Sequence, residues 1–137
     1  RHFSIAIADI DRFKSINDSL GHEQGDEVLR QISNIFKTRS RGQDVLARWG
    51  GEEFMFIFND TDEAGAVKAL EQIRATLNNA PLNINGNEIY ITSSFGVCEV
   101  TPNIDISSAI RLADKALYHA KDHGRNHVCA ASTLPCR

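Results

Sequence analysis

The chain contains the stretch Arg48-Trp49-Gly50-Gly51-Glu52-Glu53-Phe54, which lies between two apolar segments. Residues 44–47 and 55–58 are rich in strand-forming side chains, so the pattern predicts a β-hairpin. The adjacent glycines allow a tight reversal and let another molecule approach the backbone. The two carboxylates repel each other, and a hard cation such as Mg²⁺ would relieve that repulsion. A solvated acidic turn explains the same pair, so the stretch alone leaves both interpretations open.

The composition is that of one soluble globular domain, with 137 residues of which 42% are hydrophobic and 24% are charged. A net charge of −3 argues against a nucleic-acid-binding surface but allows a small phosphate ligand. No apolar run approaches the roughly 20 residues of a membrane span, and no signal peptide is visible. The three cysteines are scattered without metal-ligand spacing, which favours free thiols in a reducing cytoplasm. We therefore expect a cytoplasmic domain without membrane contact.

The first segment alternates apolar and small residues, so residues 3–8 are predicted to form a strand that ends in Asp9-Ile10-Asp11. Continued alternation places Asp9 at the carboxyl end of this strand, where ligands of α/β sheets commonly bind. A turn in which Asp11 caps the next helix is an equal alternative. Residues 12–20 predict a short helix, and a second helix is expected after Gly25. Asp26 would lie in its first turn, where a carboxylate also favours the helix dipole.

The remaining pattern predicts a third helix to about residue 77, a hairpin around Asn85-Gly86 with a long second arm over residues 89–97, and a fourth helix that ends at Gly124. A last short strand is expected over residues 126–130, followed by a flexible tail from 131 to 137. This order predicts an α+β domain whose single, mostly antiparallel sheet carries helices on both faces. The order is compatible with a ferredoxin-like core of the palm type.

Three motifs resemble signatures of the GGDEF family, the diguanylate cyclases. Residues 9–26 resemble the opening signature, residues 50–54 the motif that names the family in its Glu variant, and residues 113–126 the C-terminal signature. Their order and spacing extend the resemblance to a domain spanning residues 1–130. Such domains usually begin with a helix that carries Leu-Thr-x-Leu-x-Asn-Arg. No such segment occurs here, so we expect the domain to be cut from a larger signalling protein.

The resemblance implies a reaction in which two GTP molecules condense to cyclic di-GMP and two pyrophosphates. Each 3′-hydroxyl attacks the α-phosphorus of the other nucleotide across a two-fold homodimer, with Mg²⁺ or Mn²⁺ as cofactor. The implied metal ligands are the carboxylates of Asp9 and Glu52 and the backbone carbonyl of Ile10. Asp9, Glu52 and Glu53 are the implied catalytic residues. Sensory or regulatory domains of the parent protein are implied partners.

The resemblance also implies which residues bind nucleotide. Guanine would be bound by Asn17 and Asp26, and phosphate by Phe13, Lys14, Lys121 and Arg125. A carboxylate at Asp26 accepts hydrogen bonds from guanine N1–H and N2–H₂, whereas adenine presents an acceptor at N1, so GTP is favoured over ATP. Arg41 and Asp44 fit an Arg-x-x-Asp motif that would bind cyclic di-GMP as an inhibitor. Ordinary structural roles stay open: a surface asparagine at Asn17, or cations near the carboxyl end of a helix.

Three other functional classes remain open. The first is a catalytically silent domain that binds GTP or cyclic di-GMP and regulates a neighbouring module. The second is a purely structural or dimerising module, which leaves Asp9, Glu52, Lys121 and Arg125 unexplained. The third is a related cyclase that uses ATP, against which Asp26 argues.

Overall fold

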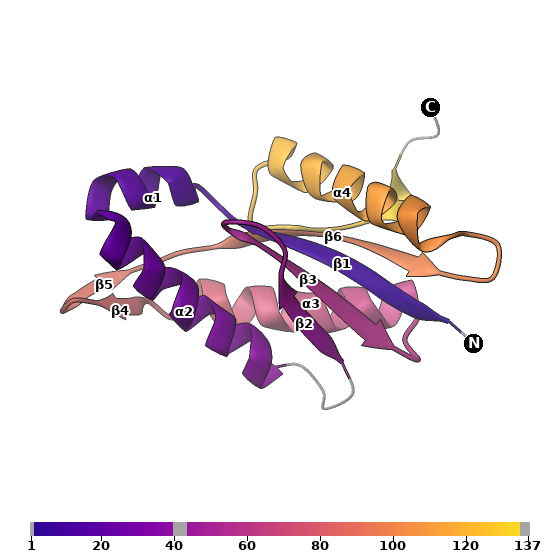
Figure 1. Ribbon diagram of the computed structural model, residues 1–137, viewed down its shortest axis with the longest axis horizontal. Coiled ribbons are helices and arrows are strands. Elements are labelled where there is room, and N and C mark those ends of the chain that lie inside the picture. The colour runs from indigo at the N-terminus through magenta and orange to yellow at the C-terminus, as the bar shows by residue number, and fades with distance from the viewer. Residues whose placement is uncertain (1, 40–43, 135–137) are drawn as a thin grey trace.

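The computed structural model describes residues 2–39 and 44–134 and shows one five-stranded sheet with helices on either side (Figure 1). The order of elements agrees with the order predicted from the sequence, except that the predicted long strand over residues 89–97 is divided and a 3₁₀ turn follows the last strand. In chain order they are β1 (Phe3–Ile10), α1 (Phe13–Leu20), α2 (His22–Arg39), β2 (Val45–Arg48), β3 (Glu53–Asn59), α3 (Glu63–Asn79), β4 (Leu82–Ile84), β5 (Asn87–Ile89), β6 (Ser93–Val100), α4 (Ile106–Asp122), β7 (Val128–Ala130) and a 3₁₀ turn, η1 (Ala131–Thr133).

The main sheet has the strand order β2-β3-β1-β6-β7. Every neighbouring pair is antiparallel except β6 and β7, which are parallel. The α+β class and the mostly antiparallel sheet are therefore confirmed. Because β1 is central, its last residues pair on one side with β3 and on the other with β6. The carboxyl end of β1 thus lies beside the tip of the β2–β3 hairpin.

The two faces of the sheet bury different side chains of the same strands, as the alternation in β1 requires. The face under α4 buries Ile5, Ile7, Met55 and Cys98 with Ala109, Ala113 and Leu117 of the helix. The opposite face buries the phenylalanines of β3 and β6 (Phe54, Phe56, Phe58 and Phe95) against α2 and α3, with Phe36 of α2 packed among them. Helices on both faces are thereby confirmed (Figure 1). Among the described residues, no helix has the length and apolar character that crossing a bilayer requires.

Gly96 sets how closely α4 packs on β6. A methyl group at this position would clash with the carbonyl oxygen of Ala113 and the amide nitrogen of Leu117, both in the backbone of α4. Because only glycine leaves that space, the helix rests directly on the strand. Lys121 lies one turn after Leu117, so this close contact also determines how high Lys121 stands above the sheet.

The predicted hairpin around Asn85-Gly86 forms, but the prediction of one sheet and one long second arm is wrong. β4 and β5 make a separate two-stranded sheet, and residues 90–92, which are not in a strand, separate β5 from β6. Asn85 and Gly86 both have positive φ, at 53° and 85°, as a two-residue hairpin turn requires. The interruption arises where the side chain of Tyr90 is 68% exposed and the chain leaves the core.

The second helix begins at His22 rather than after Gly25, so Asp26 is not in its first turn as predicted. Gly25 lies inside the helix and is buried. A side chain there would collide with the amide of Asn17 in α1. Gly25 is therefore a point of close contact between two helices, which in the sequence alone looks the same as a helix start.

The first residues of the segment predicted to be a flexible tail, which begins at residue 131, form contacts with the rest of the domain. Ala131–Thr133 form the 3₁₀ turn, and the backbone N–H and hydroxyl of Ser132 donate to the carboxylate of Glu63. Leu134 packs against buried Ala116, Ala120 and Cys129. Residues 135–137 lie outside the described part of the chain.

Candidate functional site

The predicted metal-binding residues meet at the carboxyl end of β1. Asp9 lies directly opposite Glu53 in the β1–β3 ladder, so the two side chains share one face of the sheet. The Ile10 backbone N–H donates to the Glu52 carbonyl oxygen at 3.2 Å. The hairpin therefore brings Asp9, Ile10 and Glu52 together although more than forty residues separate them in sequence.

Lys121 adds a cation to this group from α4. Its Nζ donates to Asp9 Oδ2 at 2.8 Å, and the Asp9 side chain is only 6% exposed. Burial alone would lower the pKa of Lys121, but the hydrogen bond and charge of Asp9, with the charges of Glu53 and Glu52, raise it above its ordinary value. Lys121 is therefore charged at neutral pH and neutralises part of the acidic group.

The surroundings of Glu52 and Glu53 at the hairpin tip disfavour the ionised form of both side chains. Burial and the negative charge of Asp9 raise the pKa of Glu52, while Lys121 opposes the shift. Burial raises the pKa of Glu53 as well, together with the charges of Asp9 and Asp114. The carboxylates thus repel one another at short range, which is the electrostatic setting that a divalent cation stabilises.

The chemistry of these donors fits Mg²⁺ or Mn²⁺. Asp9 and Glu52 supply carboxylate oxygens, and Ile10 supplies a backbone carbonyl oxygen, all hard ligands. In the described ranges, no group of three or more His, Cys, Asp or Glu side chains is arranged to hold a metal ion. A hard cation here would complete its coordination with carbonyl, water and phosphate oxygens, as Mg²⁺ commonly does at phosphate-transfer sites.

The amino end of α1 adjoins this group and carries the predicted phosphate-binding residue Phe13. Arg12 precedes the helix with φ 58°, and its side chain does not cap the helix. The first N–H groups of α1 therefore have no side-chain acceptor from the cap position, an arrangement that suits a phosphate. Lys14 is well exposed and lies 3.9 Å from Asp18, so its side chain remains in solvent.

The predicted guanine-binding residues lie where α1 crosses α2. Asn17 is half-buried against Gly25, the residue before Asp26, and Asp26 itself is exposed. Asn17 Nδ2 also donates to His22 Nδ1 at 3.0 Å, which fixes the orientation of the amide. The fold therefore brings Asn17 close to Gly25, the residue that precedes Asp26.

Arg125 follows α4 and lies beside the β1–α1 junction, because the backbone N–H of its neighbour Asn126 donates to Asp11 at 2.9 Å. Asp11 itself is 7% exposed, and its carboxylate accepts hydrogen bonds from Thr92 and Ser94 as well. Asp11 is therefore held among protein donors and is not oriented as an additional metal ligand.

The inhibitory site expected at Arg41 and Asp44 is separate from this group. Asp44 lies just before β2, and its carboxylate accepts a hydrogen bond from the backbone N–H of Asn59 at 3.3 Å. Asn59 ends β3 and Glu53 begins it, so roughly 20 Å of strand separates Asp44 from the hairpin tip. Arg41 lies outside the described residues.

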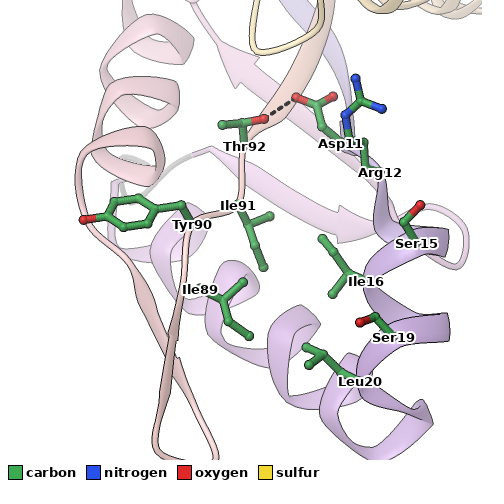
Figure 2. Close-up of a pocket in the computed structure, with 10 residues that line it drawn as sticks. All are labelled: Asp11, Arg12, Ser15, Ile16, Ser19, Leu20, Ile89, Tyr90, Ile91 and Thr92. Carbon is green, nitrogen blue, oxygen red and sulfur yellow. Dashed lines mark hydrogen bonds between the residues drawn. The ribbon is translucent and has the colours of Figure 1, made fainter.

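A pocket of about 500 Å³ lies between α1 and the segment that joins β5 to β6 (Figure 2). Ile16 and Leu20 line one side and Ile89 and Ile91 the other. None of the residues predicted to bind guanine, phosphate or metal lines it. The pocket therefore lies outside the predicted nucleotide site. The candidate site is identified by the oxygen ligands that meet at Asp9, not by the presence of a cavity.

Comparison with known proteins shows the family of the chain. The model of the family described as "Diguanylate cyclase, GGDEF domain" matches residues 1–127. The chain belongs to the GGDEF family. Diguanylate cyclase A of Treponema denticola is 42% identical over 128 residues, which cover 91% of this chain and 34% of that protein. Diguanylate cyclase DosC of Escherichia coli strain K12 is 38% identical over 126 residues, covering 91% of this chain and 27% of that protein. The chain thus spans about a third or less of these relatives.

Solved structures of other GGDEF domains have the same fold. The GGDEF domain of DgcB from Caulobacter crescentus, solved in complex with c-di-GMP, gives a TM-score of 0.91 at 35% identity, over 96% of this chain and 79% of that chain. The active GGEEF domain of a diguanylate cyclase from Vibrio cholerae gives a TM-score of 0.87 at 35% identity, over 96% and 83%. These similarities confirm the α+β fold and the family membership predicted from the sequence.

Two residues that contact the hairpin tip or influence its charges were not predicted from the sequence as site residues. Asp114 contributes to raising the pKa of Glu53 and lies seven residues before Lys121, hence on the same face of α4. That spacing is the signal by which the sequence could have revealed it. Arg48 Nη2 donates to the Gly51 carbonyl oxygen at 2.6 Å and closes the hairpin tip, a contact without a sequence signal.

Proposed function

We propose that this domain is a diguanylate cyclase, which condenses two GTP molecules into cyclic di-GMP and two pyrophosphates. The observation that carries the proposal is the convergence of Asp9, Ile10 and Glu52 at the end of β1, with Lys121 donating to Asp9 at 2.8 Å. The names of the relatives support the same activity. A bound Mg²⁺ or Mn²⁺ would lower the pKa of the attacking 3′-hydroxyl and neutralise phosphate charge.

The residues divide the remaining work among binding, orientation and proton removal. Asn17 and Asp26 select guanine, and the first N–H groups of α1 with Lys121 and Arg125 bind the triphosphate. Glu52 and Glu53 are the candidate proton acceptors, because burial raises the pKa of both and makes each a better base. Each domain binds one GTP, so two domains must face each other to align each hydroxyl with the other α-phosphorus.

The proposed inhibitory site is separate from the proposed catalytic site. Cyclic di-GMP bound at Arg41 and Asp44 would inhibit the enzyme from a distance, since Asp44 lies at the far end of the β2–β3 hairpin from Glu52. We further propose that the domain acts in the cytoplasm under the control of other domains of a longer protein. A homodimer is needed for catalysis, and the isolated chain is expected to be mainly monomeric.

The test is incubation of the chain with GTP and Mg²⁺, followed by chromatography of the products. Specific activity should rise with enzyme concentration over a hundredfold range, because two domains must meet. Glu52→Gln, which preserves volume, should lower the rate at least about a hundredfold without loss of folding. If a forced dimer binds GTP without turnover, the domain is a silent GTP-binding regulator instead. A rate strictly proportional to concentration from a proven monomer would contradict the two-domain mechanism.

A further inference from the structure

The loop between α4 and β7 has an unusual backbone. Gly124, Arg125 and Asn126 follow one another with φ angles of 105°, 62° and 49°. Residues other than glycine seldom adopt positive φ, and asparagine tolerates it better than arginine. Such a conformation persists only where surrounding contacts hold it, and it is concentrated at functional sites.

The backbone of this loop is held by Asp11. Asn126 N–H donates to Asp11 Oδ2 at 2.9 Å and lies 3.1 Å from Ser94 Oγ. The same carboxylate accepts hydrogen bonds from Thr92 Oγ1 at 2.7 Å and Ser94 Oγ at 2.6 Å. Figure 2 shows the bond to Thr92 beside the start of α1. One buried carboxylate therefore ties the α4–β7 loop to the β1–α1 junction and to the start of β6.

The side chain of Asn126 makes a second attachment, to α3. Its Oδ1 accepts a hydrogen bond from Arg74 Nη1 at 3.0 Å, and its Nδ2 donates to Asn78 Oδ1 at 3.2 Å. Arg125 N–H in turn donates to the Ala120 carbonyl oxygen at 3.1 Å. The backbone of Arg125 is thus fixed on one side by the end of α4 and on the other by Asn126.

We propose that Asn126 and Asp11 are positioning residues that hold Arg125 in its left-handed conformation, so that its guanidinium meets the triphosphate at the β1–α1 junction. This inference rests on the proposed function. Neither side chain needs to touch the nucleotide, because both are already occupied by protein partners. A long arginine on an unrestrained loop loses conformational freedom when it binds phosphate, and a fixed backbone lowers that loss.

The experiment compares two variants of Asn126 in the full chain. Asn126→Ala removes both attachments to α3 and disfavours positive φ, whereas Asn126→Gly removes the attachments but permits positive φ. Asn79→Ala, an exposed neighbour of Asn78 on α3, is the matched control. The probes are α,β-methylene GTP and guanosine, each with Mg²⁺, and Trp49 beside Glu52 is the single tryptophan and serves as the fluorophore. Thermal unfolding verifies that each variant is folded.

Both Asn126 variants should bind α,β-methylene GTP about tenfold more weakly, the size expected when a charge-assisted phosphate contact is loosened. Guanosine affinity should stay within about twofold of wild type, since Asn17 and Asp26 are unaffected. Hydrogen exchange at the backbone N–H of residue 126 should accelerate in both variants, and the control should match wild type.

Other results overturn the inference. Unchanged affinity for the analogue in both variants, or an equal loss of guanosine binding, would show that Asn126 has no positioning role for phosphate. Weaker binding of the analogue by Asn126→Ala alone would show that phosphate binding depends on the positive φ of residue 126 and not on the hydrogen bonds to α3. A wild-type chain that binds the analogue no better than guanosine would instead refute the proposed function, and the positioning role with it.

Discussion

The ammonium group of Lys121 lies 2.8 Å from Asp9 Oδ2 and donates a hydrogen bond to it, so a cation from the last helix neutralises a carboxylate of the first strand. Asp9 is also a proposed metal ligand. In the nucleotide-free chain, a metal ion that binds the Asp9 carboxylate therefore meets the repulsion of the Lys121 charge. When a triphosphate is present, Lys121 has a second anion to pair with, so metal and nucleotide should bind cooperatively.

The first prediction concerns this competition. Lys121→Met should tighten Mn²⁺ binding to the nucleotide-free chain by about tenfold, because the positive charge beside the Asp9 carboxylate is removed. The same variant should bind GTP more weakly. Electron paramagnetic resonance of free Mn²⁺ measures the first effect directly. Lys115→Met, an exposed lysine of the same helix, is the control; equal tightening in both variants would mean that only overall charge matters.

The second prediction concerns the dependence of stability on pH in the presence of EDTA. The folded-state pKa values of Glu52 and Glu53 are raised above the ordinary value of 4.5, so the folded chain binds more protons than the unfolded chain. Their contribution to stability is therefore greatest at low pH and is lost as the pH rises through the raised pKa values. Glu52→Gln should be more stable than wild type at pH 7.5, and the difference should shrink toward pH 4.5.

Urea unfolding at several pH values measures this difference. Glu88→Gln, which changes an exposed glutamate of β5, is the control for the loss of one carboxylate. A stability difference for Glu52→Gln that does not change with pH would show that Glu52 is not crowded by Asp9.

The third prediction concerns choice of base. Asp26→Ser should reduce the preference for GTP over ATP by about a hundredfold, because the carboxylate that accepts guanine N1–H is removed. Competition binding of the two nucleotides measures the ratio. Glu23→Ser, at an exposed acid of the first turn of α2, controls for loss of negative charge. An unchanged ratio in a folded Asp26 variant would exclude Asp26 as a base-reading residue.

The fourth prediction concerns inhibition by product. Arg41→Ala should spare catalysis and weaken inhibition by cyclic di-GMP roughly ten- to a hundredfold, the value of one charge-assisted hydrogen bond of about 1.5–3 kcal/mol. Initial rates are titrated with cyclic di-GMP after bound product has been removed enzymatically. Gln43→Ala, in the same segment, should behave as wild type. Equal inhibition constants for wild type and Arg41→Ala would mean that residues 41–44 are only a surface turn.

Much of the fold was predictable because its signals are local. The alternation in β1 placed Asp9 on the face of Ile5 and Ile7, and the glycine pair at 50–51 marked the hairpin tip. The start of α2 was not predictable, because Gly25 contacts Asn17 across a helix pair and a helix-start glycine has the same local pattern. The break at residues 90–92 was missed for a similar reason, since β-forming side chains continue through it.

The candidate site was predictable as a set of residues but not as an arrangement. Motif resemblance selected Lys121 as a phosphate ligand, and nothing in the sequence indicated that it would contact Asp9 across 112 positions. The role of Asp11 was also hidden, because a carboxylate beside a proposed metal ligand suggests a further ligand. Only the tertiary contacts with Thr92, Ser94 and Asn126 reveal that it serves as an anchor.

Because α4 packs directly on Gly96, the distance between the charges of Lys121 and Asp9 depends on the absence of a side chain at a position in the middle of the sheet. A methyl group at Gly96 would press on the backbone at Leu117, and Lys121 is one turn farther along the same rigid helix. A shift of α4 away from the sheet would lengthen the ionic contact between Lys121 and Asp9, so an uncharged substitution at Gly96 would alter the proposed metal site. The lack of a side chain at Gly96 in β6 thus sets the distance between the charges of Lys121 and Asp9 near the end of the sheet.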